Sequence, residues 1–159
     1  MKENVKNKLV PFSLGVLQIF IGITAVMGGF GLVSDPTGNK MDVPLGLLKN
    51  SPFTSYLIPG LILLIFNGFG NVLAGTATFV RHRHAANLAI FFGVFLTLYM
   101  TIEVWIIGLQ NFSQPLYIFL GAAELTLGIK LYKSAKKDRQ TRNLKGLSAS
   151  IDTYRQAIH

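Results

Sequence analysis

The sequence predicts an all-α integral membrane protein: a bundle of four transmembrane helices with both termini in the cytoplasm. Two features of composition predict this fold class. Of the 159 residues, 50% are hydrophobic and only 14% are charged, whereas soluble domains carry about 25% charged residues. The charges are also segregated, because long apolar runs alternate with short basic segments. The apolar runs lack the polar stripe that each helix of a soluble bundle would show.

Four segments are candidates to cross the membrane, since a spanning helix needs about 20 mostly apolar residues. They are residues 10–33, 55–80, 85–108 and 115–132. The first run of 24 residues contains no charge and exceeds the apolar core of a signal peptide, about 7–15 residues, so we expect a retained helix. Residues 1–133 therefore form a four-span domain, and residues 134–159 a basic, partly amphipathic cytoplasmic tail.

The distribution of basic residues predicts the orientation. The amino-terminal flank, the connection at 81–84 and the carboxy-terminal flank together hold 13 of the 15 basic residues, and short cytoplasmic connections are enriched in Lys and Arg. The loops at 34–54 and 109–114 then face outward. The net charge of +8 is explained by contact with anionic lipid, so we expect no nucleic-acid partner. The expected lipid contacts are Lys133, Lys136, Lys137, Arg139, Arg81 and Arg83.

Each span carries small or polar residues at helical spacing, which predicts that these stripes face one another inside the bundle. At about 1.5 Å per residue, Gln18, Asn71 and Glu124 fall at one depth, roughly 12–14 Å from the cytoplasmic ends. Asn67 lies about one turn higher, and Glu103 lies near the outer interface. These five residues are the candidate ligand or proton site.

Glu124 either faces the interior or falls on an outward face, and an inward Glu124 has two interpretations that the sequence leaves open. An ionised glutamate in hydrocarbon costs about 2.5–3.5 kcal/mol or more on insertion scales, so we expect Gln18 and Asn71 to donate hydrogen bonds to it. In the first interpretation Glu124 is a hydrogen-bonded node that holds helices together. In the second it is a proton or cation site, or the anchor of a cationic ligand.

The outer loop at 34–60 contains turn signals around Pro36 and Pro52, and it forms either a cap over the outer mouth of the bundle or a simple connector. Its runs SDPTG, PLGLL and SPFTSYLIPG resemble a group of small, uncharacterised bacterial membrane proteins with four spans. The resemblance covers roughly residues 20–130. It implies the same topology and a bacterial inner membrane, and it brings no catalytic motif.

The sequence favours a non-enzymatic function as a structural, assembly or lipid-binding component of the bacterial membrane. The alternative is a small proton- or cation-coupled transporter or channel that uses Glu124 with Asn71 and Gln18. An enzyme would have to transfer protons with these same side chains, and we find no cofactor motif and no metal-ligand set. The expected partners are membrane lipid and either a second copy of the chain or a larger membrane complex.

Overall fold

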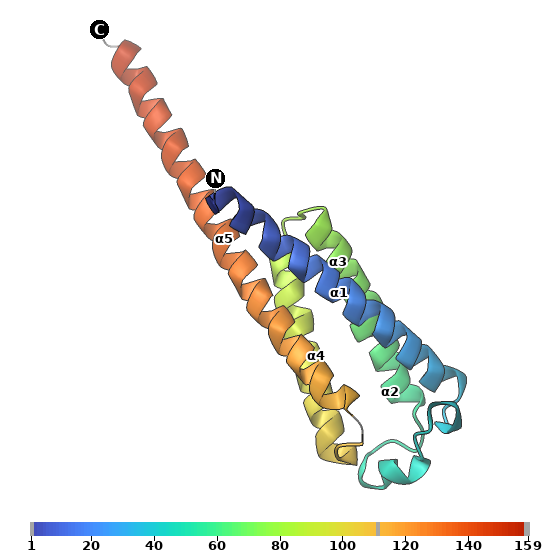
Figure 1. Cartoon of the computed structure of the whole chain (residues 1–159). Helices are drawn as coiled ribbons and strands as arrows, with labels where there is room; N and C mark the ends of the chain where they lie inside the picture. Colours follow the sequence, from blue (N-terminus) through green and yellow to red (C-terminus); the bar gives the residue numbers. More distant parts are fainter. Residues whose placement is uncertain (1, 111, 158–159) are drawn as a thin grey trace.

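A computed structural model, which describes residues 2–110 and 112–157, shows an all-helical chain (Figure 1). No strand occurs within those residues. The second apolar segment is one continuous helix in three parts, because a π-helical stretch joins two α-helical ones. The elements are α1 (Lys2–Ser34), η1 (Asn39–Met41), η2 (Leu45–Asn50), α2 (Leu57–Ile62), η3 (Leu63–Phe69), α3 (Gly70–Phe79), α4 (Ala85–Ile107) and α5 (Ser113–Ala157).

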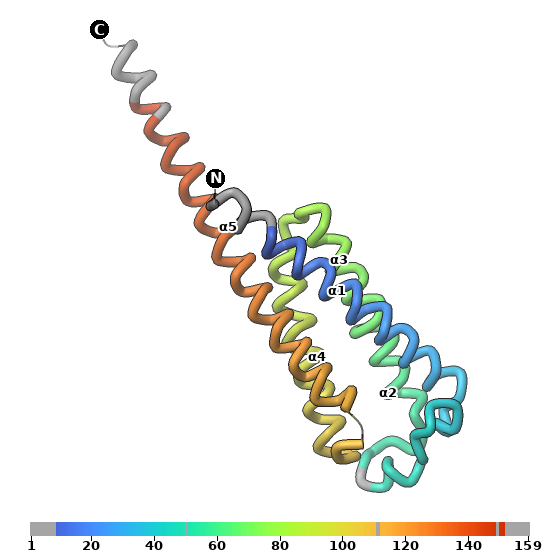
Figure 2. Tube along the Cα trace, viewed as in Figure 1, coloured from blue at the N-terminus to red at the C-terminus, as the bar shows by residue number. Residues whose placement is uncertain are grey.

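The helices form two hairpins, α1 with the continuous α2–η3–α3 helix, and α4 with α5 (Figure 2). Each hairpin also contacts the other, through α1 against α5 and through α3 against α4. Around the bundle the order is therefore α1, α3, α4 and α5, with neighbouring helices antiparallel. The α3–α4 connection lies at one end of the bundle, and the long loop that holds η1 and η2 lies at the opposite end (Figure 1).

Glycines allow the backbones within each hairpin to approach closely. A Cβ atom added at Gly29 of α1 would lie 2.6 Å from the backbone nitrogen of Leu64. On the other hairpin, one added at Gly93 of α4 would lie 2.6 Å from the backbone nitrogen of Leu125. Such contacts between small residues hold helices together where lipid supplies no hydrophobic drive for their association.

Within the described part of the chain, three segments are long and apolar enough to cross a membrane: Leu9–Ser34, Leu57–Phe79 and Ala85–Ile107. Large apolar side chains such as Phe30, Leu73 and Leu98 point outward from them and are more than half exposed. A water-soluble protein does not usually expose so much continuous apolar surface, so these helices indicate a membrane protein. The segment predicted as the fourth span, 115–132, forms the first part of α5.

Helix α5 runs without a break through residue 133, where the predicted tail begins. At 45 residues and about 1.5 Å per residue it is roughly 68 Å long, and its second half projects beyond the bundle (Figure 1). The boundary between domain and tail is therefore a change of composition within one helix. The last two residues of the predicted tail lie outside the described part of the chain.

The outer loop is an ordered structure that packs against the bundle. The hydroxyl of Tyr56 donates to the carbonyl of Pro44 at 3.0 Å, and the backbone nitrogen of Tyr56 donates to the carbonyl of Pro36 at 2.9 Å. Both Tyr56 and Leu48 are buried, and η2 packs against α4. Of the two expected forms of the loop, the structure shows the cap, which covers the end of the bundle opposite the α3–α4 connection.

Candidate functional site

A chain of hydrogen bonds crosses the interior and joins three helices. The side-chain nitrogen of Gln18 on α1 donates to Oε1 of Glu124 on α5 at 2.9 Å. The hydroxyl of Thr78 on α3 donates to Oε1 of Gln18 at 2.8 Å and also lies 2.9 Å from the carbonyl oxygen of Ala74. All three side chains are essentially inaccessible to solvent. Because Thr78 occupies the amide oxygen of Gln18, the amide nitrogen is directed at Glu124.

Four polar side-chain atoms among the described residues are buried without a hydrogen-bond partner. They are Oε2 of Glu124, Oδ1 of Asn71, and both Nδ2 and Oδ1 of Asn67. An unpaired buried polar group costs about 1–3 kcal/mol. Three of the four unpaired atoms are oxygens, so the interior presents mainly acceptors, which suit a proton, water or a cation.

The π-helical stretch η3 places Asn67 in the interior. Asn67 and Gly68 are the buried residues of η3, and π-helical turns are rare and often occur at functional sites. The side-chain nitrogen of Asn71 donates to the backbone carbonyl of Asn67 at 3.1 Å. The structure shows no hydrogen bond from Asn71 to Glu124, so that expectation is wrong: the side-chain nitrogen of Asn71 bonds to its own helix, and Oε2 of Glu124 has no partner.

A second site lies at the outer end, where a cavity of about 450 Å³ opens between the loop and the helices. Pockets that bind small molecules typically span about 300–1,000 Å³. Almost all of its lining is apolar. The lining residues are Leu32, Val43, Leu48, Ser51, Phe53, Tyr56, Pro59, Ile62, Phe95, Leu98, Tyr99, Ile102, Glu103, Ile106 and Ile107.

Glu103 is the charged residue of the cavity lining. Its Oε1 accepts a hydrogen bond from the side-chain nitrogen of Gln114 at 3.2 Å, and Oε1 of Gln114 accepts one from the backbone nitrogen of Gln110 at 2.7 Å. Gln114 is a neutral donor, so the negative charge of an ionised Glu103 is not balanced by it. No lining residue is basic.

The hydroxyl groups of the cavity all donate to backbone carbonyls. Tyr99 donates to Pro59 at 3.0 Å, Tyr56 to Pro44 at 3.0 Å, and Ser51 to Leu48 at 2.9 Å. Their hydrogens are therefore engaged within the protein. The cavity offers a carboxylate acceptor and no uncommitted side-chain hydroxyl donor.

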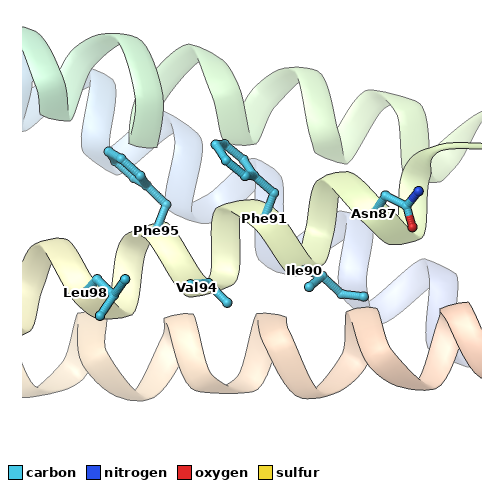
Figure 3. Close-up of a pocket in the computed structure, with 6 residues that line it drawn as sticks. All are labelled: Asn87, Ile90, Phe91, Val94, Phe95 and Leu98. Atoms are coloured by element: carbon cyan, nitrogen blue, oxygen red, sulfur yellow. The ribbon is translucent and has the colours of Figure 1, made fainter.

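A shallow apolar groove of about 540 Å³ runs along α4 and continues toward the cavity. Figure 3 shows its lining side chains, with Phe91 and Phe95 directed toward the α2–η3–α3 side and Ile90, Val94 and Leu98 toward α5. Phe95 and Leu98 line both the groove and the cavity. The two hollows therefore lie next to each other along α4.

The five predicted site residues belong to two separate places. Gln18, Asn67, Asn71 and Glu124 are buried in the interior, whereas Glu103 lines the outer cavity. Gly93 packs on Leu125, beside Glu124, and Glu103 lies ten residues farther along α4, about 15 Å away along the helix. The six basic residues expected to contact lipid are all exposed.

Sequence analysis left the hydrogen-bonding residues Thr78, Tyr99 and Gln114 out of the candidate site, although it placed Thr78 on the inward face of its helix. Thr78 had a usable signal, because it follows Asn67 and Asn71 on the same face of the helix. Tyr99 and Gln114 had none, since tyrosine is common near membrane interfaces and Gln114 acts through a residue on a different helix.

The comparisons with known proteins add no relative: no family model, no curated protein and no solved structure matches this chain.

Proposed function

We propose that this protein is a non-enzymatic component of the bacterial inner membrane that binds a membrane lipid in its outer cavity. The cavity carries the proposal. It is large enough for part of an amphiphile, it is lined by apolar side chains from the loop and from two hairpins, and it holds one carboxylate. Lipid binding requires a cavity of suitable shape with an apolar lining. It does not require a catalytic side chain.

In the proposed arrangement the first part of α5 is the fourth span, and both termini lie in the cytoplasm. Gln18 bonded to Glu124 supports this, because α5 contributes to the interior beside the three apolar helices. The exposed basic residues of α5, Lys133, Lys136 and Lys137, then meet the anionic inner leaflet. A second copy or a larger membrane complex remains the proposed partner.

Filling the cavity tests this function. We would replace Ile62 or Ile106, two lining residues on different helices, by Trp, and compare lipid retained by the purified protein using native mass spectrometry. Retention should fall by at least about tenfold, the effect of losing 1.4 kcal/mol of binding. Ile23→Trp is the matched control, because Ile23 is exposed on α1 outside the cavity. Equal retention by wild type and both filled variants would refute the proposal.

A second candidate function is proton- or cation-coupled transport through the interior. The unpaired Oε2 of Glu124 and the unpaired side-chain atoms of Asn67 favour it. In sealed vesicles with an imposed pH gradient, transport predicts a flux that Glu124→Gln abolishes and that Thr126→Val retains. Thr126 is exposed and bonds its own helix. Absence of flux in the wild type, under proton and monovalent cation gradients alike, would leave lipid binding as the function.

A further inference from the structure

The polar atoms of the cavity select among lipid headgroups, an inference that rests on the proposed lipid-binding function. We propose that the bound lipid carries a primary ammonium group, which donates to the carboxylate of Glu103, and that one acyl chain lies in the groove along α4. The headgroup end would occupy the outer cavity, and the chain would point toward the middle of the membrane.

The choice of an ammonium group follows from the donors and acceptors present. Glu103 presents a carboxylate whose one hydrogen-bond partner among the described residues is the neutral amide of Gln114. The hydroxyls of Tyr56, Tyr99 and Ser51 already donate to backbone carbonyls. An ammonium group supplies both the missing positive charge and the missing donors. An anionic headgroup would meet the carboxylate and find no free hydroxyl donor.

The groove fits a chain in the outer leaflet. Its lining begins at Asn87 and ends at Leu98, which also lines the cavity. Those eleven steps along α4 span about 16 Å, close to half of the roughly 30 Å hydrocarbon core. Glu103 lies beyond Leu98, toward the end of α4 that the outer loop covers. A headgroup at Glu103 with its chain in the groove therefore has the orientation of an outer-leaflet lipid.

Lateral entry follows from the same geometry. The groove residues Phe91 and Leu98 are more than half exposed, and Figure 3 shows the lining side chains on α4 between the α2–η3–α3 helix and α5. Because the groove is shallow and shares Phe95 and Leu98 with the cavity, a chain lying in it would reach the cavity from the side. The outer loop does not have to open.

The test compares lipids that share identical chains and differ in the headgroup. Protein in mild detergent is titrated with phosphoethanolamine, phosphocholine and phosphoglycerol lipids, and binding is followed by native mass spectrometry. We expect the ethanolamine lipid to bind roughly tenfold more tightly than the glycerol lipid, as for one hydrogen bond to a charged group. The choline lipid, which keeps the charge and lacks the N–H donors, should fall between them. Ethanolamine without chains should not bind.

Glu103→Gln should bring the affinities of the ethanolamine and glycerol lipids within about twofold of each other while total lipid binding persists. Asp42→Asn is the matched control, because it removes a carboxylate from the outer loop outside the cavity lining, and it should leave the preference unchanged. Two outcomes would overturn this inference and leave the proposed function standing. In the first, Ile62→Trp abolishes lipid binding, but the wild type shows no headgroup preference. In the second, the headgroup preference survives Glu103→Gln. Absence of any cavity-dependent lipid binding would instead refute the proposed function.

Discussion

Gln18 and Glu124 are separated by 106 residues and joined by a buried hydrogen bond of 2.9 Å, from the amide nitrogen of Gln18 to Oε1 of Glu124. Because Gln18 also accepts from Thr78, one side chain links α1, α3 and α5. This buried contact connects the two hairpins in the interior, and it explains how an acid is accommodated among apolar residues of α5.

Replacing Gln18 by Leu should destabilise the protein by about 2–4 kcal/mol, because it leaves Oε1 of Glu124 buried without its donor and removes the acceptor of Thr78. Unfolding by a denaturing detergent in micelles measures this. Thr24→Val is the control, since the hydroxyl of Thr24 bonds only carbonyls of its own helix. The double variant Gln18→Leu with Glu124→Leu should recover part of the loss. Additive losses would show that the two residues are not coupled.

Replacing Gly29 by Ala should destabilise the first hairpin by about 1–3 kcal/mol, the usual cost of overpacking a close contact. The added methyl group would meet the backbone of Leu64 at 2.6 Å, and backbone has little freedom to move away. Gly146→Ala is the control within α5, where nothing lies within 4 Å, and it should be neutral or slightly stabilising. The same unfolding measurement serves both. Equal stabilities of the Gly29→Ala variant and the wild type would contradict the close approach of α1 to the backbone of Leu64.

The carboxylate of Asp35 organises the start of the outer loop. It accepts hydrogen bonds from the Thr37 hydroxyl and from the backbone nitrogens of Thr37 and Lys40, and these bonds lower the pKa of Asp35. A lowered folded-state pKa contributes stability above the ordinary value of about 3.9 and loses it as the pH falls through the folded value. The loop should therefore loosen on acidification below about pH 4.

Hydrogen exchange at the Lys40 amide, corrected for the intrinsic rate at each pH, measures this loosening. Wild type should lose protection in that acidic range, and Asp35→Asn should show weaker protection with no such step. Asp42→Asn, in the same loop, should behave as the wild type. A wild-type protection that stays constant down to pH 2 would contradict the role of Asp35.

The membrane topology can be tested directly because the chain contains no cysteine. A single cysteine at Asn39 should react with an impermeant maleimide from outside intact cells, and one at Lys137 should react only after permeabilisation. Both side chains are exposed. A cysteine that does not react therefore lies on the other side of the membrane and is not simply buried in the protein. Labelling of both positions from the same side would show that an even number of spans separates them, and it would remove the first part of α5 as the fourth span.

Sequence analysis predicted the helical segments well where the pattern was local. The apolar runs at 10–33, 55–80 and 85–108 agree closely with the three helices able to cross a membrane. The sequence also predicted that the basic residues 133–145 extend the last helix, and α5 confirms this by running without a break to Ala157. The π-helical turn at Asn67 left no local signal, since it depends on packing against α1.

The sequence by itself determined which segments are helical, which faces carry the small and polar residues, and where the acids occur along each helix, because hydropathy and residue spacing act within one helix. Only the tertiary structure decided which polar groups meet. Gln18 reaches Glu124 while Asn71 does not, and Glu103 is assigned to a loop-covered cavity, because hydrogen-bond partners and cavity walls come from different helices whose register depends on close glycine contacts.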